Sequence, residues 1–331
     1  MKLYPMKFSP ILKDKIWGGK KLKELLNKSE ATDISGESWE LSGVEGELSV
    51  VTNGFLSGNN IEELSEVYMG DLLGQKVFSK FGTKFPLLIK FIDATDDLSI
   101  QVHPNDEQAM ERHNSFGKTE MWYVMQADKD ASLIAGFNQE VNKEKYLNAL
   151  EQKKLLDILN TEKVSEGDVF FMPAGRVHAI GTGCLIAEIQ QTSDITYRIY
   201  DFDRTDDKGQ TRELHTEQAV DVIDYNYYKT YKTIYTSKEN SPVILANCQY
   251  FTTNIIELSD SIERDMNAFD SFVVYMCLEG EADIICEKIE DTHITKGETV
   301  LIPAEIAQYY LKATDKAKLI EVYIGKSENE D

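Results

Sequence analysis

The chain has 331 residues and a formal net charge of −22 at pH 7, with 57 acidic and 35 basic residues. This charge argues against nucleic acid or an anionic membrane surface as a partner, because both require a broad basic face that replaces their counterions. A small anionic substrate remains possible only if a local basic cluster dominates the field inside a cleft. At 42% hydrophobic residues, the chain can bury one large core or two ordinary ones.

The N-terminus and the cysteines bear on the compartment. The first residues lack the apolar stretch of a signal peptide, and no run of about eighteen apolar residues occurs in the chain. The four cysteines are scattered, form no C-x-x-C pair and mostly lie in apolar runs. They predict buried free thiols of a reducing compartment. We therefore expect a cytoplasmic protein that binds neither membrane nor nucleic acid.

Helical and strand-like segments alternate in the first two thirds of the chain. Apolar residues at spacings of three to four predict an amphipathic helix over 61–81. Apolar residues at 98, 100 and 102 then alternate with Ser99, Gln101 and His103, as in a strand with one apolar and one polar face. Further strands are expected at 121–126, 169–172, 185–190 and 195–202, with a second helical insert at 142–159.

The C-terminal part, from about Ser241, is almost wholly strand-like and repeats an earlier segment. The glycine and proline of EGDVFFMPAGRVHAIG align at one constant offset with those of KGETVLIPAEIAQYYLKA, and His178 then aligns with Gln308. This similarity predicts a duplicated barrel whose second copy has lost its histidine. Two Gly-x5-Pro strands can also be overlaid by chance. We place the two domains at 1–235 and 236–331.

Four side chains form a candidate metal site. The motif G-x5-P-x-G-x2-H ends at His178, and its turns fix the depth at which this imidazole enters the barrel. Gln101 and His103 are alternate residues of one strand and share a face, and Glu120 follows after a loop. Two imidazoles, a carboxylate and an amide oxygen suit zinc, with a position left for water or substrate. The alternative is that both histidines are structural.

Several segments resemble known families. The motif that ends at His178 is similar to the second conserved motif of the cupin superfamily. LSIQVHPND, GKTEMWYV, PAGRVHAIG and EIQQTSDITYRIYDFDR resemble signature blocks of type I mannose-6-phosphate isomerases in their short bacterial form, and WGGKKL and ISGESWELS resemble that family's N-terminal blocks. The resemblance spans most of the first 205 residues. It implies a mainly β protein with two double-stranded β-helix (cupin jelly-roll) barrels and helical inserts.

The resemblance also implies an activity and a cofactor. The family interconverts mannose 6-phosphate and fructose 6-phosphate, and the matched motifs imply one zinc ion per chain. Its ligands would be Gln101, His103, Glu120 and His178.

Four further residues match family positions near the metal. Arg198 falls where the family has its catalytic arginine, and Glu188 lies at the spacing of a glutamate proposed to act in proton transfer. Lys118 matches a lysine that lines the pocket. Arg204 stands where longer members carry a lysine associated with phosphate.

An aldose–ketose interconversion moves a proton between C1 and C2 through a cis-enediol. The site therefore needs a base near both carbons and positive charge at the developing oxyanion. Zinc and Arg198 would supply the charge, and Glu188 would be the base. The alternative for Glu188 is a carboxylate that only orients Arg198 or a histidine nitrogen.

Basic residues near these motifs supply the cluster that the net charge requires. They are Lys90, Lys118, Arg176, Arg198 and Arg204, and which of them binds phosphate is open. Ser99, on the same face as Gln101, can add a hydroxyl donor. The alternative for the two last arginines is exposed salt bridging, which contributes ~0–1 kcal/mol to stability.

Other functions stay open at this point. Barrel scaffolds also serve as non-catalytic sugar- or metabolite-binding proteins, and some cupins are iron dioxygenases. A structural zinc is normally closed by four Cys or His ligands, and the chain's five histidines leave few candidates for an iron site.

Trp17 and Trp39 are expected in a core or interface, without a role in the site. The sequence does not indicate the oligomeric state.

Overall fold

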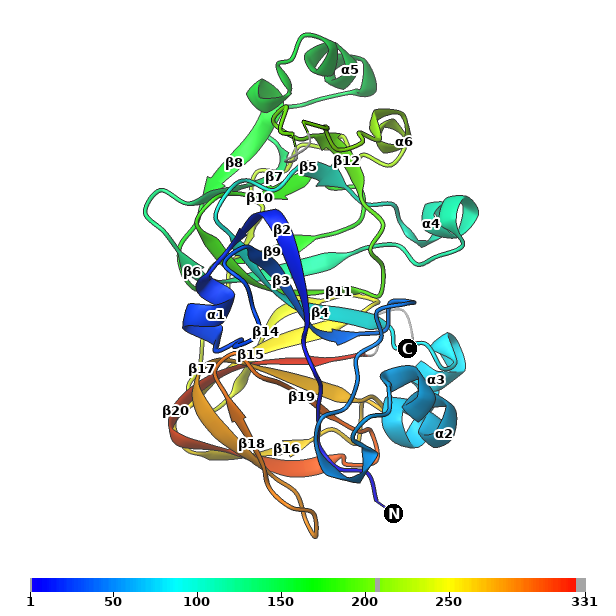
Figure 1. Ribbon diagram of the computed structural model, residues 1–331, viewed down its shortest axis with the longest axis vertical. Coiled ribbons are helices and arrows are strands. Elements are labelled where there is room, and N and C mark those ends of the chain that lie inside the picture. Colours follow the sequence, from blue (N-terminus) through cyan, green and yellow to red (C-terminus); the bar gives the residue numbers. More distant parts are fainter. Residues whose placement is uncertain (1, 206–208, 326–331) are drawn as a thin grey trace.

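The structure is a computed structural model that describes residues 2–205 and 209–325. Two β-rich units are stacked on each other, with the C-terminal third of the chain forming the lower one in Figure 1. The described strands form three open sheets rather than closed hydrogen-bonded rings. The expected mainly β cupin architecture with helical inserts is confirmed.

The upper unit consists of two sheets with antiparallel neighbours. The seven-stranded sheet runs β13 (Lys232–Thr233), β9 (Val169–Met172), β6 (Glu120–Ala127), β11 (Cys184–Gln191), β4 (Leu87–Ala94), β3 (Ser35–Ser42) and β2 (Ile11–Gly19). The five-stranded sheet runs β12 (Tyr197–Tyr200), β5 (Ile100–Val102), β10 (His178–Ile180), β7 (Ser132–Phe137) and β8 (Leu159–Lys163). The strands expected at 121–126, 169–172, 185–190 and 195–202 are therefore present; the second has the expected ends, and the ends of the other three are shifted.

The seven-stranded sheet has two different faces because alternate strand residues point to opposite sides. Ile89 and Ile189 face the lower unit and belong to its contact core. Lys90 and Glu188, which are paired neighbours on β4 and β11, point to the opposite side. That second side faces the five-stranded sheet, and an apolar cluster with members from both sheets fills part of the space between them. The remaining space holds the polar site.

The lower unit is an eight-stranded sheet that includes the chain's first strand. Its members are β1 (Met6–Lys7), β19 (Thr299–Ile302), β17 (Val273–Ile285), β20 (Gln308–Tyr323), β15 (Thr252–Leu258), β14 (Pro242–Asn247), β16 (Ser261–Asp265) and β18 (Thr292–Thr295). β1 pairs with β19, with Met6 opposite Leu301. The predicted domain boundary after residue 235 stays a prediction. β1 belongs to the first predicted domain by sequence but to the sheet of the second by its pairing.

One hydrophobic core joins the two units. Its fully buried members come from the seven-stranded sheet and from the eight-stranded sheet, and include Leu41, Phe91, Met121, Ile189, Ile255, Val274, Ile320 and Val322. Full burial of one such side chain contributes about 1.5–3 kcal/mol. The lower unit thus covers the face of the seven-stranded sheet that lies opposite the polar site.

The two units repeat the same strand-and-turn motif. Gly167 and Gly297 both have φ of 87° and begin equivalent turns into β9 and β19. Their N–H groups donate to the carbonyls of Val124 and Cys277, at 2.9 and 2.8 Å. Each turn thus makes the same backbone contact with the strand beside which the next strand pairs, β6 for β9 and β17 for β19. The repeat expected from the sequence is confirmed for this motif.

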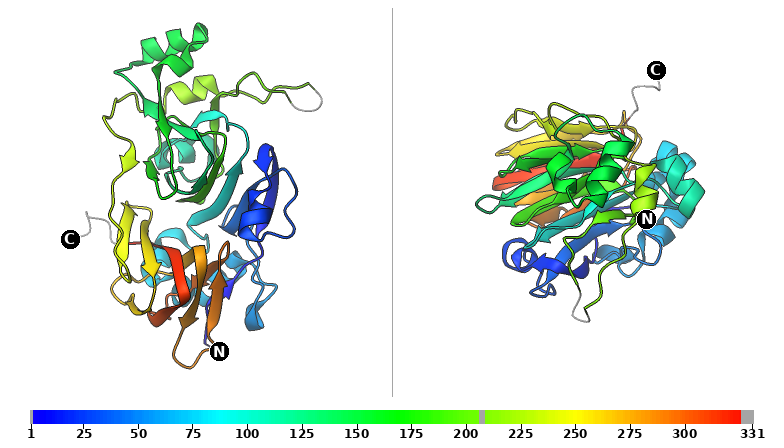
Figure 2. Two further views of the ribbon diagram at one scale, coloured as in Figure 1. Left: turned by 90° about the vertical axis from the view of Figure 1, so that its left-hand side faces the viewer. Right: turned by 90° about the horizontal axis from the view of Figure 1, so that it is seen from above.

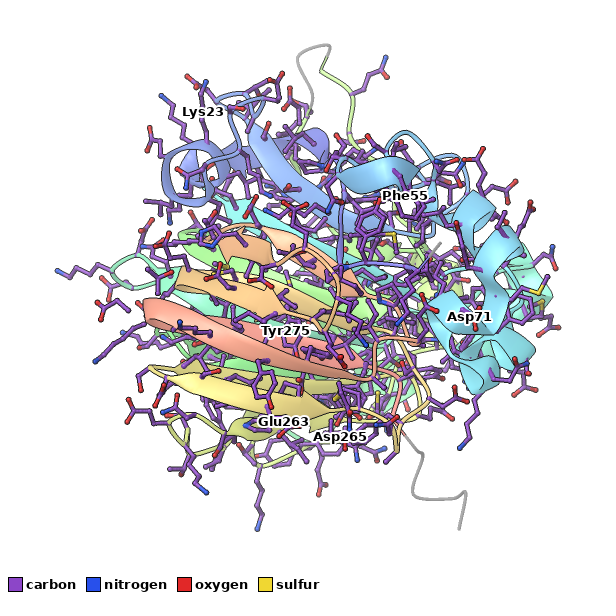
Figure 3. The ribbon with its side chains drawn as sticks, turned by 90° about the horizontal axis from the view of Figure 1, so that it is seen from below. Lys23, Phe55, Asp71, Glu263, Asp265 and Tyr275 are labelled. Atoms are coloured by element: carbon purple, nitrogen blue, oxygen red, sulfur yellow. The ribbon has the colours of Figure 1, made fainter. Side chains whose placement is uncertain are left out.

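The repeat does not extend to the side chains that follow the proline. His178 is buried, whereas Gln308 is exposed and its neighbour Tyr309 points inward. In Figure 3, Tyr275 is labelled among the strands of the lower unit and Asp265, which pairs with Gln308, near its margin. At the position aligned with His178 the second copy therefore has an exposed glutamine, and the buried side chain next to it is a tyrosine. The second copy has lost its histidine, and a tyrosine stands in the inward place.

A polar cluster fills the interior of the lower unit. Glu321 pairs across the sheet with Tyr275, as Glu188 pairs with Trp122 in the upper unit. Arg264 binds Glu321 through Nε and Nη2 at 2.8 and 2.9 Å, and the Tyr275 hydroxyl donates to it at 2.6 Å. The arginine neutralises the buried carboxylate, so this interior is closed by an internal ion pair.

The predicted helix over 61–81 is two helices, α2 (Ile61–Leu73) and α3 (Gln75–Phe81). The break is at Gly74, which has φ of 93°, and a Cβ there would lie 2.0 Å from the carbonyl oxygen of Asp270. The Asp270 carboxylate also accepts the first N–H groups of α3. Both helices lie to one side of the stacked sheets (Figure 2, right). A contact with the lower unit therefore ends the first helix.

The remaining helices are short. They are α1 (Lys21–Leu26), α4 (Asp106–His113), α5 (Lys143–Glu151) and α6 (Thr216–Val220), with 3-10 turns at Gly54–Leu56 and Leu155–Ile158. The insert expected at 142–159 is confirmed as α5 and the second 3-10 turn, and Leu159 already begins β8.

None of the helices in 2–205 and 209–325 has the length and apolar character needed to cross a bilayer. All four cysteines are free thiols, and three of them are buried.

The turn before β19 is tied to the N-terminal strand by an ion pair. Lys7 Nζ lies 2.8 Å from Glu298 Oε1, and Glu298 Oε2 accepts the Thr295 N–H at 2.8 Å. Burial alone would raise the pKa of Glu298, but Lys7 and Thr295 hold it below its ordinary value. A carboxylate with a lowered pKa in the folded state adds stability above its unfolded pKa and loses it as pH falls through its folded pKa.

We expect Glu298→Gln to lower the free energy of unfolding by about 0.5–1 kcal/mol at neutral pH. This difference in the free energy of unfolding between variant and wild type should shrink as pH falls from about 5 toward about 3, because the Glu298 carboxyl of the wild type is then protonated in both the folded and the unfolded state. Urea unfolding followed by circular dichroism measures it, with the exposed Glu287→Gln as the control. A difference that persists at low pH would contradict the assignment.

Candidate metal centre and active-site cavity

The predicted metal ligands come from both sheets of the upper unit. Gln101 lies on β5 and pairs with His178, the first residue of β10. His103 follows β5 directly, and Glu120 begins β6 of the facing sheet. Because β5 and β10 are neighbours, alternation along β5 places Gln101 and His103 beside the His178 imidazole. The four side chains therefore meet between the two sheets.

Three ligand atoms converge in this space. Glu120 Oε1 lies 3.0 Å from His103 Nε2 and 3.0 Å from His178 Nε2, and the two Nε2 atoms are 3.1 Å apart. All three side chains are at most 1% exposed. His103, Glu120 and His178 thus form a compact group of metal-ligating side chains.

Backbone carbonyls orient both imidazoles. His103 Nδ1 lies 2.8 Å from the Ile195 oxygen, and His178 Nδ1 lies 2.8 Å from the Arg176 oxygen. A carbonyl only accepts, so each Nδ1 carries the proton and each Nε2 presents a lone pair. Burial and the nearby Lys118 lower the pKa of His103 to about 3. Its imidazole is therefore neutral at ordinary pH.

Glu120 is ionised and adds its carboxylate oxygens to the Nε2 lone pairs of His103 and His178 as a third acceptor group. Burial alone would raise its pKa, but Lys118 and the two histidines hold the pKa well below its ordinary value. Both carboxylate oxygens are buried without a hydrogen-bond partner. A buried carboxylate facing two nitrogen lone pairs is unfavourable unless a cation lies among them. The residues therefore fit a divalent metal ion.

Gln101 lies at the edge of this group. Its Nε2 is 3.3 Å from His178 Nε2. Oxygen and nitrogen of a side-chain amide exchange places when the amide is turned over, so either atom can face the group. Its oxygen can thus complete a mixed nitrogen and oxygen ligand set.

A cavity of about 470 Å³ opens beside the metal centre. Six residues named from the sequence line it, and they are Lys90, Ser99, Gln101, Lys118, Glu188 and Arg198. Because Gln101 also contacts His178, the ligand group lies against the inner wall of the cavity. The structure thus brings the metal ligands, the proposed base and the proposed catalytic arginine to one place.

Glu188 is held by two neighbours in its sheet. Trp122 Nε1 donates to its Oε1 at 2.8 Å, and Lys90 Nζ lies 3.0 Å from its Oε2. Burial raises the pKa of Glu188 to about 7, although Lys90 opposes the shift. Arg198 and the histidine nitrogens make none of these contacts, so they give no support to the alternative that Glu188 only orients those groups, and the role of Glu188 stays a prediction.

Arg198 extends into the cavity from β12. Its Nε donates to Ser99 Oγ at 3.3 Å and its Nη1 to the Glu213 carbonyl at 3.0 Å. In the described part of the chain its guanidinium forms no ion pair with a carboxylate within 4.0 Å. Exposed salt bridging therefore does not explain Arg198, and its charge is available to a ligand.

Two of the expected basic residues lie outside the lining. Arg204 Nη2 binds Asp201 Oδ1 at 2.7 Å and its Nη1 lies 3.4 Å from Asp96 Oδ2. Arg176 stacks its guanidinium between two tyrosines of the segment 225–231. The predicted contact of Arg204 with substrate stays a prediction without direct support from its position.

Several lining residues were missed by the sequence reasoning. They are Lys13, Lys15, Trp17, Glu37, Trp39, Arg212 and His215, most of them from β2, β3 and the segment before α6. Both tryptophans had been expected in a core or interface without a role in the site, and both are buried, with Trp17 in the apolar cluster between the two sheets. Trp39 instead lies 5.1 Å from Lys13 Nζ and 5.2 Å from Lys90 Nζ. The segment ISGESWELS, which contains Glu37 and Trp39, was the available signal.

Comparison with known proteins decides the family. Residues 6–135 match the catalytic domain of type I phosphomannose isomerases, and residues 243–324 match the cupin domain of mannose-6-phosphate isomerases. Mannose-6-phosphate isomerase ManA of Bacillus subtilis is 36% identical over 311 residues, which are 93% of this chain and 96% of the relative. The chain belongs to the type I phosphomannose isomerase family.

Two further relatives agree with this assignment. The mannose-6-phosphate isomerase of Streptococcus mutans is 34% identical over 89% of this chain and 91% of its own length. The crystal structure of a mannose 6-phosphate isomerase from Bacillus subtilis superimposes with a TM-score of 0.86 and 30% identity, covering 97% of this chain and 99% of the other. The phosphomannose isomerase fold therefore extends over the whole chain, including the C-terminal third.

Proposed function

We propose that the protein interconverts mannose 6-phosphate and fructose 6-phosphate at one zinc ion, through a cis-enediol. The observation that carries this proposal is the buried His103–Glu120–His178 group beside a cavity lined by Glu188, whose pKa is raised, and by Arg198, which has no ion-pair partner in the described part of the chain. Membership of the phosphomannose isomerase family supports the substrate pair.

The metal would be held by His103, Glu120 and His178, with the Gln101 oxygen as a fourth ligand. Nitrogen and oxygen ligands that leave one open position are typical of catalytic zinc. When bound, zinc acts as a Lewis acid that stabilises negative charge on the substrate oxygens. The nearby Lys118 ammonium, on a side chain 5% exposed, adds positive charge to the same region.

Glu188 is the proposed base. Its carboxylate takes the proton from one carbon and returns it to the next, so it must face both C1 and C2. Lys90 and Trp122 fix its position, and the raised pKa suits a group that accepts and releases a proton near neutral pH. Arg198 is the proposed catalytic donor at the oxyanion, because its guanidinium is permanently charged and has no carboxylate partner among the described residues.

The anionic substrate agrees with the local charge of the cavity rather than with the net charge of −22. Lys90, Lys118 and Arg198 line it. Ser99 supports Arg198 through its hydroxyl and is proposed to contact substrate. The free thiols favour a reducing compartment, and we propose a cytoplasmic enzyme that acts on a small sugar phosphate without nucleic acid or membrane partners.

Chelation and reconstitution test the proposal. Purified protein should convert mannose 6-phosphate to fructose 6-phosphate in a coupled assay, lose this activity with a chelator and regain it with zinc. If activity returned with iron but not with zinc, iron would replace zinc as the proposed ion. No turnover by zinc-loaded protein, even with neighbouring sugar phosphates as substrates, would overturn the function and favour a sugar-binding protein without catalysis.

A further inference from the structure

A sugar 6-phosphate must bind with its two ends in different places. The proton moves between C1 and C2, whereas the phosphate is attached to C6, and this separation rests on the proposed function. The metal ligands and Glu188 mark the reacting end. A second, cationic place is therefore needed in the cavity, away from the metal ligands and Glu188.

Three of the six cations in the lining already have a carboxylate of their own. Lys13 pairs with Glu47, and Lys15 Nζ lies 3.3 Å from Glu37 Oε1. Lys90 is paired with Glu188 at the reacting end. A neutralised lysine attracts an anion weakly, because the carboxylate repels it.

Arg212 belongs to a group with more cations than buried anions. The Asp201 carboxylate, which is 5% exposed, accepts from Arg212 Nε at 2.7 Å and from Arg212 Nη2, while it also accepts from Arg204 Nη2 at 2.7 Å. One buried carboxylate thus holds two guanidinium groups. Three carboxylates nearby, Asp96, Asp194 and Glu213, are exposed, so water screens their charge.

The position of Arg212 follows from its neighbours. Arg198 donates to the carbonyl of Glu213 at 3.0 Å and to Ser99 on the strand that leads to Gln101. Contacts therefore run from Gln101 through Arg198 to the segment of Arg212. Asp201 accepts from Nε and Nη2 of Arg212, which lines the cavity, and among the described residues Arg212 Nη1 makes no hydrogen bond.

His215 adds a neutral donor at the same end. Its Nδ1 accepts the Arg198 N–H at 3.2 Å, so the neutral imidazole carries its proton on Nε2. His215 and Thr196 both line the cavity. A guanidinium, an imidazole N–H and a hydroxyl are donors that suit a phosphate group.

We propose that Arg212, fixed by Asp201, binds the phosphate group of the substrate, with His215 and Thr196 as additional donors. Arg212 sets specificity for a phosphorylated sugar and takes no part in proton transfer. Arg204 supports it indirectly by sharing Asp201.

Arg212→Met should raise KM for mannose 6-phosphate by about 10–100-fold and change kcat less than threefold, since a charge-assisted contact contributes this much to binding. Arg212→Lys should recover part of the loss. Arg112→Met, the same change in an arginine of α4 outside the cavity lining, is the control. Arg204→Met should have a smaller effect than Arg212→Met, and the reverse order would overturn the inference.

A binding measurement separates this inference from the proposed activity. Mannitol 6-phosphate and mannitol carry no carbonyl, so their affinities for zinc-loaded protein can be compared by calorimetry without turnover. We expect tighter binding of the phosphorylated compound by wild type, and loss of most of the difference in Arg212→Met. If this binding pattern is found but the wild type does not isomerise mannose 6-phosphate, the proposed isomerase function is wrong and the inference about Arg212 still holds. An active wild type whose Arg212→Met variant binds both compounds unchanged would sink the inference alone.

Discussion

Replacing His178 by alanine should remove the metal and lower kcat/KM for mannose 6-phosphate by about 10³-fold or more. The group loses one of its two imidazoles, and Lewis-acid stabilisation contributes several kcal/mol to such reactions. Glu120→Gln should have a similar effect while keeping the size of the side chain. Metal content from plasma emission spectroscopy, measured on the same samples as activity, tests both variants.

His293→Ala is the control for this pair, because His293 lies exposed on β18 and bonds to Asp283 on the surface. Circular dichroism shows whether each variant keeps its sheet structure. A folded His178→Ala protein that retains both metal and turnover would contradict the assigned metal centre.

Replacing Glu188 by glutamine should lower kcat by about 10²–10⁴-fold and leave the metal content unchanged. The substitution keeps the shape and the Trp122 contact but removes the group that accepts the proton. Exchange of deuterium from C2 of labelled mannose 6-phosphate into water should fall by a similar factor. This second readout matters because a carboxylate with only a positioning role would slow turnover without being the proton acceptor.

Glu40→Gln is a closely matched control. Glu40 is also a buried glutamate paired with a lysine, since Lys28 Nζ lies 2.7 Å from its Oε2 and the two side chains are 8% and 4% exposed. It lies outside the cavity lining. Glu40→Gln should therefore lose stability but keep kcat and exchange. Equal kinetic losses in both variants, or full turnover in Glu188→Gln, would remove Glu188 as the base.

The candidate metal ligands could be found from the sequence because their signals are local. Alternation along one strand places Gln101 and His103 on a shared face, and a glycine and proline turn positions His178. Each of these patterns spans fewer than about a dozen residues and depends on backbone geometry alone. The same reasoning located the strands that carry Glu120 and Glu188.

The partners of these residues could not be found in this way. Lys90 reaches Glu188 because β4 and β11 are neighbours in the sheet, and this pairing follows from the topology. Arg212 follows Arg204 by eight residues outside any strand. Nothing in the local sequence shows that one of these arginines faces the cavity.

Long-range contacts also account for the differences between the fold expected from the sequence and the observed one. The break at Gly74 depends on Asp270, which is far away in the sequence. The inward position of Tyr309 instead of Gln308 reflects a one-residue change in which face of the strand is buried, and such a change reverses every side chain that follows. Trp39 lines the cavity because of the sheet that its strand joins.

The core shared by the two units limits how the enzyme can be shortened. Ending the chain after residue 235 would expose the apolar face of the seven-stranded sheet, including Phe91 and Ile189, to water. Such a fragment would aggregate or require a substitute partner, even though it would retain every proposed ligand and catalytic group. The lower unit therefore occupies the place that a second subunit has in an obligate dimer, and because it is covalently attached, this association does not depend on protein concentration.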